Sequence, residues 1–284
     1  MNTVNMPSIQ ANALAMRAAQ ARPSRIAIAL AASALLLLSM LPATAAARPV
    51  LAAARPTIVL VHGAWAGPAG WDQVVAGLRK DGYATATPTL DEATLSGDAA
   101  TVRATLDAIP GKKILVAHSY GGMVITNAGS GRSDVLALVY SAGLVPDEGE
   151  SSFSIQEGYK QSDALNHLVF DPYPFAYIDP AFFPAIFCQE LSPKKAAELN
   201  AGQRPISLVA GSEPSGPAAW HELPSWYAIS GQDRVIDPVL QEFVSARAGS
   251  TVVRFDDASH AGGFTHYAGR FVKLIEDAVA ATAD

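Results

Sequence analysis

The sequence predicts an α/β protein whose mostly parallel six-stranded sheet is flanked by helices and carries an inserted lid. Three observations predict this class. From residue 57 onward, short apolar runs alternate with segments of helical periodicity. The runs are apolar throughout, which is typical of parallel strands that are covered on both faces. The chain of 284 residues is also long enough to build one large core.

The first half of the expected domain contains four strands and three helices. Residues 57–61 (TIVLV) are apolar and β-branched, as in a buried strand. A helix with apolar residues at helical spacing follows, and Asp81-Gly82 is its stop signal. The next strand ends at Pro88, and the next helix ends at Pro110-Gly111. The runs KILVA and VLALVY are the third and fourth strands. The strands are expected at 57–61, 83–87, 113–117 and 135–140, and the helices at 71–80, 95–109 and 119–128.

The second half adds two strands and two helices. The runs SWYAIS and TVVRF, residues 225–230 and 251–255, are the fifth and sixth strands. A helix with proline in its first turn is expected at 238–248, and a final helix at 265–281.

An insertion interrupts this alternation between the fourth and fifth strands. Residues 146–205 show no clear strand and are rich in proline and aromatic residues. We expect this segment to form a lid over the carboxyl edge of the sheet, where open α/β sheets bind their ligands. Its aromatic side chains are also expected to form a small core of the lid itself. They are Phe153, Tyr159, Phe170, Tyr173, Phe175, Tyr177, Phe182, Phe183 and Phe187.

Ser119 has the surroundings of a nucleophile. The motif Ala117-His118-Ser119-Tyr120-Gly121-Gly122 follows one predicted strand and precedes a helix. Small residues two before and two after the serine permit a tight, strained turn that exposes its hydroxyl above the sheet. Alanine replaces the usual first glycine, and its methyl group is still small. An ordinary helix-capping serine is the alternative interpretation.

The loop after the first strand, His62-Gly63-Ala64-Trp65, is expected to complete an oxyanion hole. We expect the backbone N–H groups of Ala64 and Tyr120 to bind the negative charge that develops during acyl transfer. His62 is expected to hold this loop by hydrogen bonding rather than to act as a base.

Serine needs a histidine to take its proton and a carboxylate to orient that histidine. Asp233 follows the fifth strand and His260 follows the sixth, so both lie at the sheet edge that carries Ser119. The order Ser119, Asp233, His260 is the one expected of this architecture. Asp147, after the fourth strand, remains the alternative acid, and His266 is an alternative base.

The amino-terminal residues 1–45 predict a secretory signal peptide. They contain Arg17, Arg22 and Arg25 but no acidic residue, then an apolar run at 26–41, and they end in Ala-Thr-Ala. Met16 is an alternative start, and an uncleaved membrane anchor is the alternative interpretation. We expect a secreted or periplasmic protein, with a linker at 46–56, a domain at 57–284 and no stable membrane insertion after cleavage.

Charge and cysteine content exclude several classes of protein. The net charge is −6, and the chain without residues 1–45 keeps 17 basic against 26 acidic residues, which argues against nucleic-acid binding. The single cysteine, Cys188, excludes an internal disulfide framework and a thiolate metal cluster.

From residue 57 to its end the chain resembles the α/β-hydrolases, most closely the branch of plant methyl esterases, hydroxynitrile lyases and their bacterial relatives. The motifs VHGAW (61–65), AHSYGG (117–122), GQDRVIDP (231–238) and DASH (257–260) carry the resemblance. It implies the α/β-hydrolase fold, a Ser119–His260–Asp233 triad, an oxyanion hole at Ala64 and Tyr120, and no cofactor or metal.

The resemblance also implies a reaction. The lyases of this branch have a lysine after the histidine and a threonine in the first loop, whereas this chain has Ala261 and Gly63. We therefore expect a serine esterase that cleaves a small to medium apolar carboxylic ester through an acyl-enzyme. A cofactor-free perhydrolase or haloperoxidase is the alternative, and a catalytically idle binding protein is a second one.

Overall fold

The computed structural model describes residues 55–170 and 172–283. The predicted signal peptide at 1–45 and most of the linker at 46–56 lie outside the described residues. Within them, strands and helices alternate along the chain as the sequence predicts. No helix in the described ranges combines the length and the hydropathy that a membrane-spanning helix needs.

Six strands form the central sheet, and every pairing in it is parallel. The strand order is β2-β1-β3-β4-β8-β9, so β1, β3, β4 and β8 occupy the middle. The strands are β1 (Thr57–Val61), β2 (Thr85–Ala86), β3 (Lys113–His118), β4 (Val135–Ser141), β8 (Ser225–Ser230) and β9 (Thr251–Phe255). Residues of β3 and β8 are buried along their whole length, whereas most of the edge strand β9 is partly or fully exposed. The predicted α/β class with a parallel six-stranded sheet is thereby confirmed.

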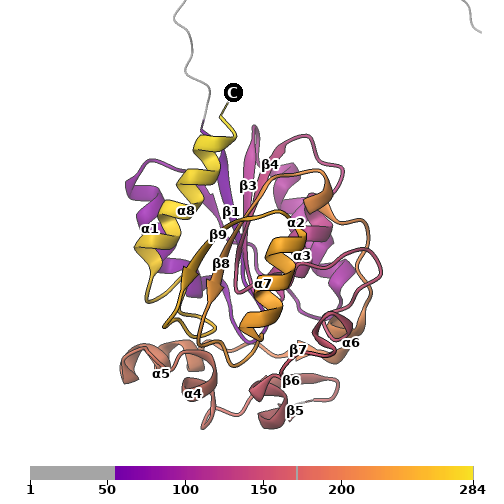
Figure 1. Cartoon of the computed structure of the whole chain (residues 1–284), viewed down its shortest axis with the longest axis vertical. Helices are drawn as coiled ribbons and strands as arrows, with labels where there is room; N and C mark the ends of the chain where they lie inside the picture. The colour runs from indigo at the N-terminus through magenta and orange to yellow at the C-terminus, as the bar shows by residue number, and fades with distance from the viewer. Residues whose placement is uncertain (1–54, 171, 284) are drawn as a thin grey trace, which may run out of the picture. The chain divides into compact units, whose positions relative to one another are not determined.

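Helices cover both faces of this sheet. Figure 1 shows α1 and α8 together on one side of the strands and α2 and α3 on the other. Trp71, at the start of α1, stacks on Phe271 of α8, and Gly77 lets the two helices approach, because a Cβ there would lie 2.9 Å from Val272. The helices are α1 (Asp72–Lys80), α2 (Leu95–Ala108), α3 (Gly121–Gly129), α7 (Pro238–Arg247) and α8 (Ala268–Ala281).

Between β4 and β8 the chain builds a second, smaller unit at the end of the sheet where the strands finish (Figure 1). It contains β5 (Leu168–Phe170), β6 (Phe175–Ile178), α4 (Phe183–Phe187), α5 (Pro193–Ala201), β7 (Ile206–Ser207) and α6 (Leu208–Ser212). The strands β5, β6 and β7 pair antiparallel in that order. Short 3-10 helices lie at Ser154–Gln156, Asp163–His167 and Ala219–His221, and a further one, Pro68–Trp71, precedes α1.

The expectation that residues 146–205 hold no strand is wrong, since β5 and β6 lie inside this range and β7 directly follows it. These strands are only two to four residues long. The apolar stretches of β5 and β6, LVF and FAYI, are too short to be told from the other aromatic and apolar residues of this segment. The strand expected at 83–87 is shorter, two residues, and lies at a sheet edge. The helices expected at 119 and 265 begin at Gly121 and Ala268, because turns precede them.

Candidate active site

Ser119 lies in a sharp turn between β3 and α3. Its backbone φ is +56°, in the left-handed region that a residue with a side chain rarely adopts. The turn is held by its own backbone, because the Ser119 N–H donates to the Ser141 carbonyl at 3.2 Å. Gly122 and Leu144 both donate to the Ser119 carbonyl, at 2.9 and 3.1 Å. The strained position of this serine is therefore fixed by bonds to the neighbouring strand end.

Two glycines bring the loop after β1 against this turn. A Cβ on Gly63 would lie 2.6 Å from the Cβ of Ser119, and a Cβ on Gly121 would lie 2.6 Å from the His62 carbonyl. Both separations are shorter than real Cβ contacts, so only glycine permits the approach. Ala117, the departure from the usual glycine, is fully buried in β3.

His260 lies between Ser119 and Asp233. Its Nε2 is 2.9 Å from the Ser119 Oγ, and its Nδ1 is 2.8 Å from the Asp233 Oδ2. Since a carboxylate only accepts, Nδ1 carries the proton and donates it, and Nε2 is left to accept from the serine hydroxyl. All three residues are buried, with 0 to 4% of their surface exposed. The structure thus places the three residues predicted from sequence in one hydrogen-bonded row.

The carboxylate of Asp233 is held by four hydrogen bonds. Its Oδ1 accepts the N–H groups of Val235 and Ile236, at 2.7 and 3.0 Å. Its Oδ2 accepts from His260 and, at 2.8 Å, from the side-chain amide of Gln241. Gln241 also accepts the Ser230 N–H at 2.9 Å, so this buried side chain ties α7 to β8. These four bonds fix the direction in which the carboxylate points.

A second histidine, His118, packs against the ring of His260. Its Nε2 donates to the His260 carbonyl at 3.0 Å, and the two ring centroids are 4.4 Å apart. Full burial lowers the pKa of His118 well below its usual value, so this ring is neutral. The ring of Phe187 meets His260 edge-on at 4.9 Å. His260 is therefore packed as well as hydrogen-bonded.

The other acid and base weighed from sequence lie elsewhere. Asp147 is bonded to His221, with its Oδ1 3.0 Å from the His221 Nε2, and 43% of its side chain is exposed. His266 is exposed and lies against Tyr267. Asp237 caps α7, because its carboxylate accepts the Val239 N–H at 3.0 Å.

His62 holds the loop after β1, as the sequence predicts. The Leu90 N–H donates to its Nε2 at 3.0 Å, so Nδ1 carries the proton and donates to the Gly63 carbonyl at 3.1 Å. Burial lowers the pKa of His62 to about 4. Glu92 lies 3.7 Å from the same Nδ1, and burial raises its pKa well above the usual value. Both shifts favour the neutral forms, so burial opposes an ion pair between these two groups.

Asp98 connects this buried cluster to the residue after Ser119. Its Oδ2 accepts the Tyr120 hydroxyl at 2.8 Å, and its Oδ1 accepts the N–H groups of Asp91 and Glu92. Burial raises the pKa of Asp98 above its ordinary value. No sequence motif indicates this cluster or Gln241. Their hydrogen-bond partners lie far apart in the chain, and a local motif does not show which face of a helix packs on the sheet.

The sequence predicts an oxyanion hole formed by the backbone N–H groups of Ala64 and Tyr120. No acceptor among residues 55–170 and 172–283 takes either N–H in a hydrogen bond. Tyr120 lies directly before α3, so its N–H adds to the positive end of that helix. Both residues border the cavity that also contains Ser119.

That cavity, about 70 Å³ in volume, is mostly apolar. Every strand of the small sheet contributes to it: Leu168 from β5, Ala176 from β6, and Ile206 and Ser207 from β7. Leu144, Val235 and Ile236 form the side that belongs to the large sheet. The smaller unit between β4 and β8 therefore forms a wall of the site.

The chain is similar to proteins of one enzyme family. The profile of the Alpha/beta hydrolase family matches residues 58–274. A carbendazim hydrolyzing esterase from Nocardioides sp. (strain SG-4G) is 39% identical over 110 residues, which cover 34% of this chain and 46% of that esterase. The match thus spans less than half the length of this curated relative.

Solved structures show the same fold. The pyrethroid hydrolase PytH superimposes with a TM-score of 0.69 at 22% identity, covering 81% of this chain and 99% of the hydrolase. Polyneuridine aldehyde esterase gives 0.68 at 18% identity, with 79% and 99% covered. A methylesterase from Arabidopsis, MES16, gives 0.63 at 20% identity, with 78% and 98% covered.

Proposed function

Because this chain belongs to the alpha/beta hydrolase family, we propose that it is a serine esterase that cleaves carboxylic esters of small to medium apolar groups. The observation that carries the proposal is the row of Ser119, His260 and Asp233, joined at 2.9 and 2.8 Å. The names of its relatives, a carbendazim hydrolyzing esterase and pyrethroid hydrolase among them, support an ester as the substrate class.

In the proposed mechanism Ser119 Oγ attacks the ester carbonyl carbon while His260 Nε2 takes the hydroxyl proton. Asp233 holds the ring tautomer and stabilises the imidazolium that forms. The N–H groups of Ala64 and Tyr120 bind the oxyanion of the tetrahedral intermediate. His260 then protonates the leaving alcohol, and a water molecule, activated by the same nitrogen, hydrolyses the acyl-enzyme.

The size of the substrate follows from the walls of the cavity. Its volume of about 70 Å³ and its mostly apolar lining suit a short acyl or alcohol group. The segment 146–205 supplies part of these walls, and we propose that it serves as a lid over the carboxyl edge of the sheet.

The test is hydrolysis of p-nitrophenyl acetate by the wild type and by Ser119→Ala and His260→Ala. Each variant is expected to lose activity by a factor on the order of 10⁶, since the two residues act as a unit. Ser152→Ala, in the wall of the same cavity, keeps most of the activity. Wild-type turnover that survives Ser119→Ala would refute the proposal. Product formation that requires peroxide and acetate would favour a perhydrolase with the same three residues.

We also propose that residues 1–45 direct export and are removed. The support is their sequence: basic residues, an apolar run and a small-residue cleavage motif. Sequencing the amino terminus of the exported protein is expected to find Ala46 first. A chain that stays in the membrane fraction with residues 1–45 attached would instead indicate an anchor.

A further inference from the structure

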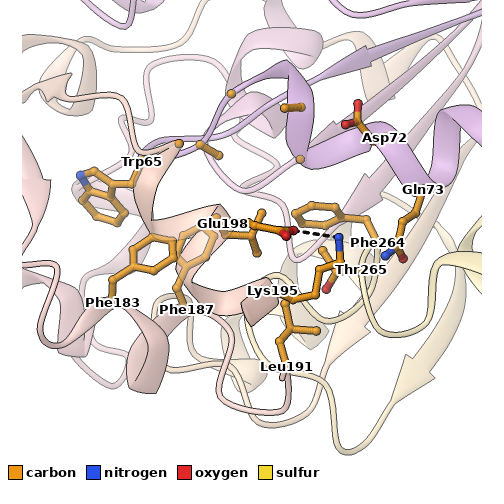
Figure 2. Close-up of a pocket in the computed structure, with 16 residues that line it drawn as sticks. Trp65, Asp72, Gln73, Phe183, Phe187, Leu191, Lys195, Glu198, Phe264 and Thr265 are labelled. Atoms are coloured by element: carbon orange, nitrogen blue, oxygen red, sulfur yellow. Dashed lines mark hydrogen bonds and ion pairs between the residues drawn. The ribbon is translucent and has the colours of Figure 1, made fainter. Parts of the chain in front are cut away.

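A second cavity lies beside the one that contains Ser119. Its volume is about 210 Å³, three times that of its neighbour. The loop after β1, the helices α4 and α5, and the turn before α8 form its walls. Figure 2 shows the rings of Phe183 and Phe187 beside each other, with Trp65 to one side and Phe264 to the other. Nothing in the proposed mechanism uses this space.

Trp65 separates the two cavities. Among the described residues that line them, it is the one that borders both. Its indole N–H donates to the Ala176 carbonyl at 3.1 Å, and 8% of the residue is exposed, so the indole is held in place. A molecule in the second cavity therefore does not reach Ser119 in this arrangement. The space is a separate site rather than an extension of the first.

The chemistry of the walls selects the ligand. Four aromatic residues, Trp65, Phe183, Phe187 and Phe264, stand in its wall, each at most 8% exposed, and aromatic rings gain from packing against one another. Apolar cavities of about 150 Å³ in proteins hold a benzene molecule, so this one has room for one or two fused rings. On these grounds we propose that the second cavity is an accessory binding site for an uncharged aromatic molecule of one or two rings.

The charges at this cavity argue against an anion. Lys195 is paired with Glu198 at 2.8 Å, and both side chains are about half exposed (Figure 2). The remaining charged residue of the lining is Asp72. A carboxylate ligand would meet a cation that is already neutralised and an additional negative charge, whereas a neutral ring meets neither cost. Binding is expected to distinguish 1-naphthol from 1-naphthoate.

The occupant would lie one aromatic layer away from His260. Phe187 packs edge-on against His260 at 4.9 Å, and Phe264 lies 4.6 Å from the ring of His118. Both phenylalanines line the second cavity. The site is thus built from the side chains that hold the histidine pair, although it opens away from Ser119.

The experiment is titration calorimetry of the full chain with 1-naphthol. We expect one molecule bound per chain, and binding of 1-naphthoate that is weaker by at least about tenfold. Leu199→Trp and Leu191→Trp, which fill the second cavity, are each expected to weaken 1-naphthol binding by at least about tenfold. Leu208→Trp is the matched control, because it fills the cavity at Ser119 instead and is expected to leave the binding intact.

Thermal melting followed by circular dichroism shows which variants are folded, and two filling variants are used so that one unstable protein does not decide the result. The proposal is overturned if the wild type binds no 1-naphthol, or if Leu208→Trp abolishes binding while folded Leu199→Trp and Leu191→Trp retain it. A crystal grown with 1-naphthol is expected to show its ring among Phe183, Phe187 and Phe264. The measurement needs no turnover, so it is independent of the esterase proposal.

Discussion

At the residue scale, two carboxylates were candidates for the acid of the site, and the geometry separates them. Asp233 bonds to His260, whereas Asp147 bonds to the exposed His221. Asp233→Asn is expected to lower kcat by a factor on the order of 10³ to 10⁴, because the amide no longer selects the productive tautomer of the ring. Asp147→Asn is expected to leave kcat unchanged. Steady-state kinetics with p-nitrophenyl acetate check both, and the reverse ranking would assign the acid to Asp147.

Glu92 makes the stability of the protein depend on pH. It is 1% exposed, and neither carboxylate oxygen accepts a hydrogen bond from the described residues. Burial and then the charge of Asp98 raise the pKa of Glu92 well above 4.5. Above pH 4.5 the unfolded chain releases this proton while the folded protein keeps it. The folded state then binds more protons, so stability falls as the pH rises.

Glu92→Gln removes this contribution while keeping the shape of the side chain. From about pH 5 upward the free energy of unfolding is expected to fall more steeply with pH in the wild type than in Glu92→Gln, by up to about 1.4 kcal/mol per pH unit. Urea titrations across this range measure the difference. Glu157→Gln, at an exposed position, is the control and should follow the wild type. Parallel curves for wild type and Glu92→Gln would show that Glu92 is ionised in the folded protein.

At the scale of elements, periodicity located the large sheet and missed the small one. The strands β1, β8 and β9 have the bounds that their apolar runs predict. For β1 and β8 the reason is burial, because strands inside a parallel sheet are covered on both faces and need such runs. The strands β5 to β7 have no such demand, since each is at most four residues long. Their pairing depends on contacts between residues distant in sequence, and these are invisible to a local pattern.

The same distinction applies to the site. Ser119, His260 and Asp233 were predictable because each follows a strand, and the ends of parallel strands share one edge. Gln241 lies on α7 and Asp98 on α2, and no motif marks either one. Their role in holding the site depends on which helix face meets the sheet, and this is settled by packing of the whole domain.

The small sheet controls the size of the cavity at Ser119. Leu168 of β5 faces this cavity, and the next residue, Val169, points to the opposite face of the strand. Leu168→Ala is expected to raise kcat/KM for p-nitrophenyl hexanoate relative to the acetate by about tenfold, because the shortened side chain admits a longer acyl group. Val169→Ala is the matched control and should keep the wild-type ratio. An equal change in both variants would mean that the strand has moved and that Leu168 does not limit the acyl group.

At the scale of the whole molecule, stability has to come from packing, because one cysteine cannot form a disulfide within the chain. Cys188 directly follows α4 and is buried, and this burial raises the pKa of its thiol to about 12. Thiol reagents react with the thiolate form of cysteine. The native protein should therefore react slowly for two reasons, because Cys188 is buried and because its thiol stays protonated. Labelling of Cys188 then reports how often the surrounding structure opens.

With Ellman's reagent, native protein is expected to react slowly, and the rate should rise with urea as steeply as the equilibrium for global unfolding. The melting temperature should be the same with and without a reducing agent. Rapid labelling without urea, at unchanged melting temperature, would show that α4 opens locally while the large sheet stays intact.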